Sequence, residues 1–333
     1  SFKPFIYSAA LEKGYTQETM IENMPLTLSA EEAGGTAWEP QNYDGSSSGP
    51  VRMRSALTKS LNLVSVRILQ GIGPYYARDY IRRFGFDPAR HPPYLTMALG
   101  AGSVTPLQMA AAYGVFANGG FSVKPYLIDK VTDKDGRLLM QSSPQKLGSN
   151  APRVIDPRNA YLMTTMMQDV VRYGTAARAG QLGRGDLAGK TGTTNDALDT
   201  WFAGYNPNLV AVAWVGYDQP RSLGRSETGA QSALPIWMSF MDSALRGVPQ
   251  KGWTTPAGII TLNIDPATGT RLPESTVVDE LLGDLLGESS PGMVEHFYQE
   301  FPPPDAPAAG WGADQADPGA PPAPAPATPG TPL

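Results

Sequence analysis

The order in which two hydrophobic patterns occur along this 333-residue chain constrains its fold most. Helical periodicity comes first, in segments that end at Gly or begin at a Thr-Pro or Asp-Pro pair: residues 60–69, 75–83, 105–118 and 156–173. Strand-like segments follow after residue 185, at 187–193, 200–205 and 209–217. Adjacent strands joined by a short turn are antiparallel, whereas alternating strands and helices indicate a parallel sheet. We therefore predict an α/β fold of the α+β type, with an antiparallel sheet flanked by helices.

Four further segments complete the expected secondary structure. Residues 5–11 form an apolar run that stops at Gly14, which predicts a short buried helix. Residues 124–139 predict a hairpin with Asp135-Gly136 at its turn. A helix is expected over 233–245 and a short strand over 258–264.

Composition excludes several classes of chemistry. The chain has no cysteine, which rules out disulfides, thiolate metal sites and cysteine nucleophiles. Its two histidines, His91 and His296, are predicted to be solvated, and a Ser-His-Asp triad or multi-histidine metal centre is not expected. A net charge of −5 without a Lys/Arg stripe argues against a nucleic-acid partner. No cofactor is predicted, and lysine is the natural candidate for a catalytic base.

Composition also divides the chain into three parts. The main domain is expected over residues 1–248, followed by a small extension with short strands at 249–300 and a disordered Pro/Ala-rich tail at 301–333. No apolar run approaches the roughly 20 residues that cross a bilayer. The chain begins without Met or a leader peptide, so we expect that further residues precede Ser1.

Lys3 is the first candidate for chemistry. Residues three apart share a helix face, so a serine immediately before Ser1 would lie beside this amine, whereas Ser1 itself does not fit the spacing. Burial among Phe2, Phe5 and Tyr7 would lower the pKa of the amine and let it act as a base. The alternative is a surface lysine whose stem covers apolar residues.

Ser60-Leu61-Asn62 is the second candidate. A hydroxyl and a carboxamide two residues apart can point into one cleft, relay a proton and hold a substrate amide. The alternative is a helix start at which Ser60 is only a cap.

Lys190-Thr191-Gly192-Thr193 is the third candidate. On an edge strand, Lys190 would supply a positive charge, the two threonines hydrogen bonds, and Gly192 room for a ligand backbone. The chain can thus bind an extended peptide that ends in a carboxylate, unless this is an ordinary strand. Ser143-Pro144-Gln145-Lys146 has the Ser-x-x-Lys spacing but a loop composition, and we interpret it as a surface loop.

Together, the three motifs resemble the penicillin-recognising serine transferases in order and approximate spacing. The segments 38–42, 97–100, 118–120 and 199–205 resemble the transpeptidase domain of class A penicillin-binding proteins, and the resemblance covers most of residues 1–248 and, more loosely, 264–269. It implies a helix-flanked antiparallel sheet with the site between the sheet and a helical subdomain.

The resemblance also implies roles for the residues. The serine before Ser1 would attack the penultimate D-Ala carbonyl of a peptidoglycan stem peptide, and Lys3 would take its proton. Ser60 would return a proton to the leaving amine, and Asn62 would hold Lys3 and the substrate amide. Lys190, Thr191 and Thr193 would bind the terminal carboxylate beside Gly192, and the Thr193 N–H would form half of the oxyanion hole.

The implied partners are peptidoglycan stem peptides, β-lactam antibiotics, and an upstream part of the same protein with a glycosyltransferase domain and a membrane anchor. The implied location is the periplasmic face of the bacterial inner membrane.

Two alternatives stay open. A D,D-carboxypeptidase or β-lactamase would pass the acyl group to water, although the chain lacks the Glu-x-x-Leu-Asn of class A β-lactamases and has Ser-x-Asn rather than Tyr-x-Asn. A relative that truly lacks the serine would be a non-catalytic module that binds cell-wall peptide.

Overall fold

A three-stranded antiparallel sheet positions the residues of interest. In the computed structural model, which describes residues 1–224, 226–272 and 292–305, its strands are β5 (Ala188–Thr193), β6 (Asp199–Asn206) and β7 (Leu209–Gly216), in the order β5-β6-β7. The side chain of Asn206 accepts hydrogen bonds from the backbone N–H groups of Asn208 and Leu209, which closes the turn between β6 and β7. β5 lies at an edge of the described sheet, as the sequence predicts.

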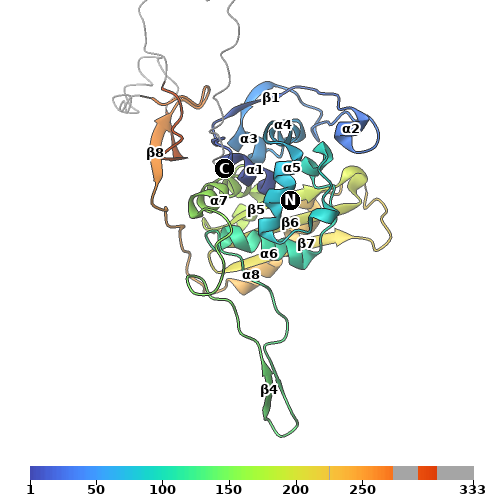
Figure 1. Ribbon diagram of the computed structural model, residues 1–333, viewed down its shortest axis with the longest axis vertical. Helices are drawn as coiled ribbons and strands as arrows, with labels where there is room; N and C mark the ends of the chain where they lie inside the picture. The colour runs from blue at the N-terminus through green and yellow to red at the C-terminus, as the bar shows by residue number, and fades with distance from the viewer. Residues whose placement is uncertain (225, 273–291, 306–333) are drawn as a thin grey trace, which may run out of the picture.

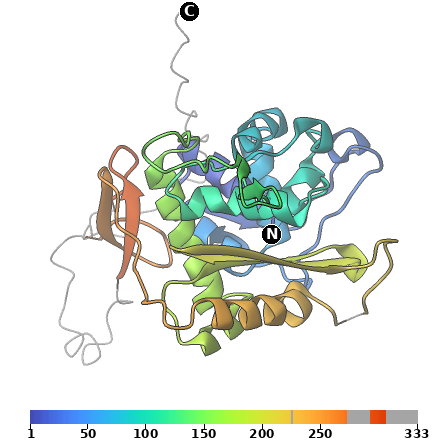
Figure 2. The ribbon, with the colours of Figure 1, turned by 90° about the horizontal axis from the view of Figure 1, so that it is seen from below.

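Helices cover both faces of this sheet, as Figure 2 shows. Helices α6 (Pro106–Ala117) and α7 (Pro157–Arg172) pack on one face, and α8 (Leu234–Ala244) packs on the other after the π-turn Gly229–Ala233. Trp237 of α8 meets Phe202 of β6 edge to face, with ring centroids 4.8 Å apart. Burial of one such aromatic side chain contributes about 2–3 kcal/mol. The predicted class, an antiparallel sheet flanked by helices, is confirmed.

Helix α1 (Lys3–Glu12) runs through the helical part of the molecule (Figure 1). Every residue from Lys3 to Leu11 is buried, because α1 packs against α4 (Asn62–Ile72), α5 (Pro74–Ile81) and α7. A helix that is apolar on all sides belongs inside a core. The buried helix predicted from this segment is confirmed.

The remaining regular elements join these layers. They are β1 (Met20–Asn23) paired with β2 (Gly49–Arg52), α2 (Ala30–Ala33), α3 (Met53–Thr58), and the 3₁₀ turns Arg82–Phe84, Pro88–Arg90, Leu95–Leu99, Ala177–Leu182 and Asn195–Ala197. Thr105 and Asp156 cap α6 and α7 as their sequences predict. The expected helix start at Ser60 is wrong by two residues, because Ser60 adopts a left-handed backbone with φ +59° and α4 begins at Asn62.

The hairpin of β3 (Lys130–Thr132) and β4 (Leu138–Gln141) projects from the body of the molecule (Figure 1). Its turn is built by Asp133, whose side chain accepts from the backbone N–H groups of Asp135 and Arg137. All residues of both strands are exposed. The predicted hairpin is therefore confirmed.

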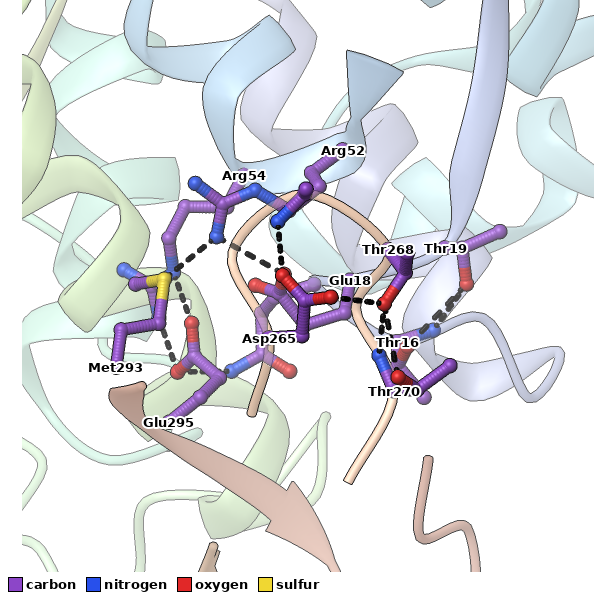
Figure 3. Close-up of polar contacts among 12 residues, drawn as sticks. Thr16, Glu18, Thr19, Arg52, Arg54, Asp265, Thr268, Thr270, Met293 and Glu295 are labelled. Atoms are coloured by element: carbon purple, nitrogen blue, oxygen red, sulfur yellow. Dashed lines mark hydrogen bonds and ion pairs between the residues drawn. The ribbon is translucent and has the colours of Figure 1, made fainter. Parts of the chain in front are cut away.

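A two-stranded antiparallel sheet of β8 (Ile259–Ile264) and β9 (Met293–Tyr298) is joined to the main body by a buried ion network, which Figure 3 shows. Arg54 of α3 lies 2.5 Å from Glu295 of β9 and 2.8 Å from Asp169 of α7. Beside it, Arg52 lies 3.0 Å from the buried carboxylate of Glu18. These charged residues come from distant parts of the sequence and meet only in the folded chain.

The three-part division at residues 248 and 300 stays a prediction. Most of the expected tail, residues 306–333, lies outside the described residues. Across 1–224, 226–272 and 292–305, no helix combines the length and apolar character that crossing a membrane requires.

Candidate active site

The first two motifs meet at the side chain of Lys3, at the start of α1. Its Nζ donates to the backbone oxygen of Ser60 at 2.6 Å and to Oδ1 of Asn62 at 2.7 Å, and lies 3.3 Å from Oγ of Ser60. The left-handed backbone of Ser60 ends the α3 segment and lets both its carbonyl and its hydroxyl face this amine. The predicted contact between Lys3 and Asn62 is present.

The third motif completes the cluster from the edge strand β5. Nζ of Lys190 donates to Oγ of Ser60 at 2.8 Å, and Lys190 is fully buried. The hydroxyl of Ser60 therefore lies between two amines that come from segments far apart in the chain. Such an arrangement can pass a proton from one amine to a bound group through one hydroxyl.

Burial controls the charge of both amines. The pKa of Lys3 is held well below its ordinary value by loss of water and by repulsion from Lys190. Burial lowers the pKa of Lys190 to about 7. The hydrogen-bond partners of both amines within the described residues are neutral oxygens of carbonyl, hydroxyl and amide groups. A neutral lysine at ordinary pH can act as a base.

Strand β5 presents the other residues of its motif to the same place. Oγ1 of Thr191 lies 2.7 Å from Oγ1 of Thr175, and Oγ1 of Thr193 accepts from the N–H of Gly229 at 3.0 Å. A Cβ on Gly192 would lie 2.6 Å from the backbone nitrogen of Ser1, so glycine lets α1 start close to the strand. The hydroxyl hydrogen of Thr193 stays available to a ligand, because its oxygen is the acceptor in this contact.

An open cleft runs past these side chains. It has a volume of about 2430 Å³, larger than the roughly 300–1,000 Å³ of pockets that enclose small molecules. It is lined by Lys3, by Ser60-Leu61-Asn62, by Thr191-Gly192-Thr193 and by Trp38, Gln41, Tyr173 and Trp201, among others. This space suits an extended chain better than a compact cofactor.

Some residues of the site were not expected from sequence. Tyr113 of α6 donates to the backbone oxygen of Ser1 at 2.6 Å, and Thr175 supports Thr191, but neither stands in a distinctive pattern. The prediction that His91 is solvated is wrong: the residue is 1% exposed, and its ring stacks on that of Phe2 with centroids 5.2 Å apart. His296 is partly buried, and its Nδ1 lies 3.0 Å from the hydroxyl of Thr261. Ser143 and Lys146 are exposed on a loop, as predicted.

The family model of the penicillin-binding protein transpeptidase domain matches residues 1–241. This chain belongs to that family. Penicillin-binding protein 1A of Neisseria lactamica is 53% identical over 263 residues, which cover 79% of this chain and 33% of the relative. Penicillin-binding protein 1A of Pseudomonas aeruginosa is 41% identical over 321 residues, which cover 83% of this chain and 39% of the relative. The chain thus spans between a third and two fifths of these relatives.

Solved structures of penicillin-binding proteins also match the fold of this chain. The crystal structure of penicillin-binding protein 1A from Haemophilus influenzae matches with a TM-score of 0.81 and 34% identity, over 91% of this chain and 48% of that chain. The PonA1 protein from Mycobacterium tuberculosis in complex with penicillin V matches with a TM-score of 0.64 and 27% identity, over 77% of this chain and 71% of that chain. The fold and the class A penicillin-binding transpeptidase family that the sequence predicts are confirmed.

Proposed function

We propose that this chain is the D,D-transpeptidase domain of a class A penicillin-binding protein, which cross-links peptidoglycan stem peptides through a serine acyl-enzyme. The observation that carries this proposal is the hydroxyl of Ser60 between the amines of Lys3 and Lys190, with Lys3 and Ser60 in the lining of an open cleft. The penicillin-binding relatives support the same chemistry.

The nucleophile is a serine immediately before Ser1, beside strand β5. Its oxygen attacks the penultimate D-Ala carbonyl while Lys3, neutral because of burial, takes the hydroxyl proton. The tetrahedral intermediate then expels the terminal D-Ala, and a proton reaches the leaving amine through Ser60. The products of this half-reaction are an acyl-enzyme and free D-Ala.

Strand β5 binds the end of the donor peptide. Lys190, Thr191 and Thr193 hold the terminal carboxylate, and Gly192 leaves room for the peptide backbone. The N–H groups of Thr193 and the nucleophilic serine form the oxyanion hole. Asn62 keeps one amide hydrogen for the substrate, because its Nδ2 makes only one donor contact within the described residues, to the oxygen of Gln41.

An amine from a second stem peptide completes the cycle. It attacks the acyl carbonyl, loses its proton to the lysine–serine pair, and releases the nucleophilic serine as the cross-link forms. β-Lactams acylate the same serine because they imitate the donor. The domain acts at the periplasmic face of the inner membrane, joined to a glycosyltransferase domain and a membrane anchor.

The proposal is tested by intact mass spectrometry of the full-length protein before and after benzylpenicillin. We expect a stable one-to-one adduct on the serine that precedes Ser1, its loss in Lys3→Ala, and its retention in Lys146→Ala, a matched lysine variant on the exposed loop. A donor pentapeptide with an acceptor amine should give a cross-linked dimer. An adduct that disappears within seconds would identify a β-lactamase, and no adduct would leave a binding module.

A further inference from the structure

Helix α4 begins beside the catalytic cluster but does not cap itself. Its first residue is Asn62, and its N-cap residue Leu61 makes no side-chain cap bond. The first backbone N–H groups of a helix have no acceptor within the helix, and a polar side chain at the N-cap normally accepts from them. In α4 this acceptor has to come from elsewhere in the chain.

Asn42 supplies it from the loop that lines the cleft. Its Oδ1 accepts from the backbone N–H of Asn62 at 2.7 Å and from that of Leu63 at 3.2 Å. Asn42 is 5% exposed, so these bonds are largely shielded from water. One amide oxygen thereby satisfies two of the free N–H groups of α4.

The amide nitrogen of Asn42 is held just as firmly. Its Nδ2 donates to Oδ1 of Asn23 at 2.7 Å and to the backbone oxygen of Ser46 at 2.7 Å. Asn23, which ends β1, donates in turn to Oγ of Ser48 at 3.1 Å. With two donors and two acceptor positions in use, the side chain of Asn42 has one allowed orientation.

The neighbouring carbonyl fixes the side chain of Asn62. Nδ2 of Asn62 donates to the backbone oxygen of Gln41 at 2.8 Å, while its Oδ1 accepts from Lys3 at 2.7 Å. A backbone carbonyl only accepts, so this contact turns the amide oxygen toward Lys3. Residues 41 and 42 therefore set both the position and the orientation of Asn62.

We propose that Asn42 is a positioning residue of the active site, which holds the first turn of α4 so that Asn62 stays in register with the amine of Lys3. Its effect on activity rests on the proposed function. Its effect on α4 and on Lys3 does not, and two of the readouts below need no catalysis.

The test compares Asn42→Ala, Asn42→Asp and Asp156→Ala in the full-length protein. Asp156 is a matched control, because its carboxylate caps α7 through a bond of 2.8 Å to the N–H of Arg158, away from the lysines. We expect Asn42→Ala to slow acylation by penicillin about tenfold or more, since small misplacements of reacting groups are costly. Asp156→Ala should lower the melting temperature to a similar extent and leave acylation nearly unchanged. Asn42→Asp should recover only part of the rate: its carboxylate still accepts from both N–H groups of α4, but its second oxygen meets the oxygens of Asn23 and Ser46, to which Asn42 donates.

Two measurements test the effect of Asn42 on α4 and on Lys3 and do not depend on catalysis. Amide hydrogen exchange at Asn62 and Leu63 should accelerate in Asn42→Ala and not in Asp156→Ala. The pKa of the Lys3 amine, followed by NMR, should rise toward its ordinary value only in Asn42→Ala, because a loosened Asn62 admits water.

Unchanged exchange or an unchanged Lys3 pKa in Asn42→Ala would overturn the proposal. Equal losses of acylation in Asn42→Ala and Asp156→Ala would overturn it too, because Asn42 would then act only through overall stability. If the unaltered protein forms no penicillin adduct, the proposed function fails, and exchange together with the Lys3 titration still decides the role of Asn42.

Discussion

Two of the buried clusters of ionisable groups among the described residues differ in composition: one holds two amines and no carboxylate, and the other pairs a guanidinium with carboxylates. In the site, Lys3 and Lys190 face one another across Ser60, surrounded by neutral oxygens. In the network of Figure 3, the buried guanidinium of Arg54 lies against the carboxylate of Glu295. The same guanidinium also pairs with the carboxylate of Asp169 on α7. Both clusters join segments that are far apart in the sequence.

The difference shows what each cluster is suited to do. A buried cation without an anion relieves its loss of water by losing a proton, which is why the pKa of Lys190 falls to about 7. Burial alone would also lower the pKa of Arg54, but Glu295 and Asp169 more than offset it and raise that pKa. The unopposed amines can exchange protons near neutral pH, whereas the paired guanidinium stays charged and fastens β9 to α3.

Removing an unopposed amine should abolish chemistry and leave stability nearly intact. Lys3→Met should slow penicillin acylation by about 10²–10⁴-fold, the range for loss of a general base. Its free energy of unfolding should fall by no more than about 1 kcal/mol, because the hydrogen bonds lost are offset by relief of the buried amine's desolvation and of its repulsion from Lys190. Stopped-flow acylation and urea denaturation measure the two effects. A stability loss of roughly 3 kcal/mol, the scale of a broken buried ion pair, would contradict this expectation and would mean that Lys3 stabilises the fold as Arg54 does.

Removing the paired cation should do the reverse. Arg54→Met leaves the buried Glu295 and the partly buried Asp169 without their partner and should lower the free energy of unfolding by about 3–5 kcal/mol. Acylation per folded molecule should change less than about twofold. Arg83→Met is the control, because its pair with Glu12 is exposed and contributes about 0–1 kcal/mol. Equal stability losses in the two variants would contradict the comparison.

The pH dependence of stability tests the same comparison on a buried carboxyl group, that of Glu18 beside the Arg54 network. Burial, together with repulsion from Glu295, raises the pKa of Glu18 from 4.5 to about 7. A carboxyl whose pKa is higher in the folded state stabilises the fold below its unfolded pKa, and this stability is lost as pH rises from 4.5 to about 7. In Glu18→Gln, the free energy of unfolding lost between pH 4.5 and about 7 should therefore be smaller by about 1–3 kcal/mol. Urea titrations at a series of pH values test this, and an unchanged slope would be incompatible with the shift.

The smallest expected effect concerns Lys190. Its charge attracts a ligand carboxylate below its pKa of about 7 and is lost above it. Raising the pH from 7 to 8 should therefore weaken the preference for a carboxylate-bearing β-lactam over its methyl ester by up to about fivefold. The ester is the matched control, since it shares the ring but carries no charge. A preference that is constant over this interval would mean that Lys190 stays charged.

The sequence predicted the features that depend on residues close together in the chain. Thr105 and Asp156 indicate the starts of two helices, because each caps N–H groups only a few residues away. The hairpin of β6 and β7 is likewise encoded by its turn residues. Lys3, Ser60, Asn62 and Lys190 meet as the motifs predict. Each motif alone has an ordinary structural explanation, and only their occurrence together in this order indicated a shared site.

Contacts across the chain were not predictable in the same way. The pair of Arg54 and Glu295 joins residues 241 positions apart, and nothing near either residue marks the other. The burial of His91 depends on Phe2, which packs against a proline-rich loop that looks solvated in sequence. The cap of α4 was missed for the same reason, because Asn42 acts 20 residues away from the helix that it caps.

The burial of α1 from Lys3 to Leu11 has a practical consequence. Lys3 meets Ser60 across 57 residues and Ser60 meets Lys190 across 130, so the three groups converge only after the helical core has closed around α1. A fluorescent antibiotic that attaches at this place would then count natively folded molecules one by one, even in a heterogeneous preparation. The rate at which labelled molecules appear during refolding would measure how fast the core forms around α1. A bound antibiotic would stabilise the folded state.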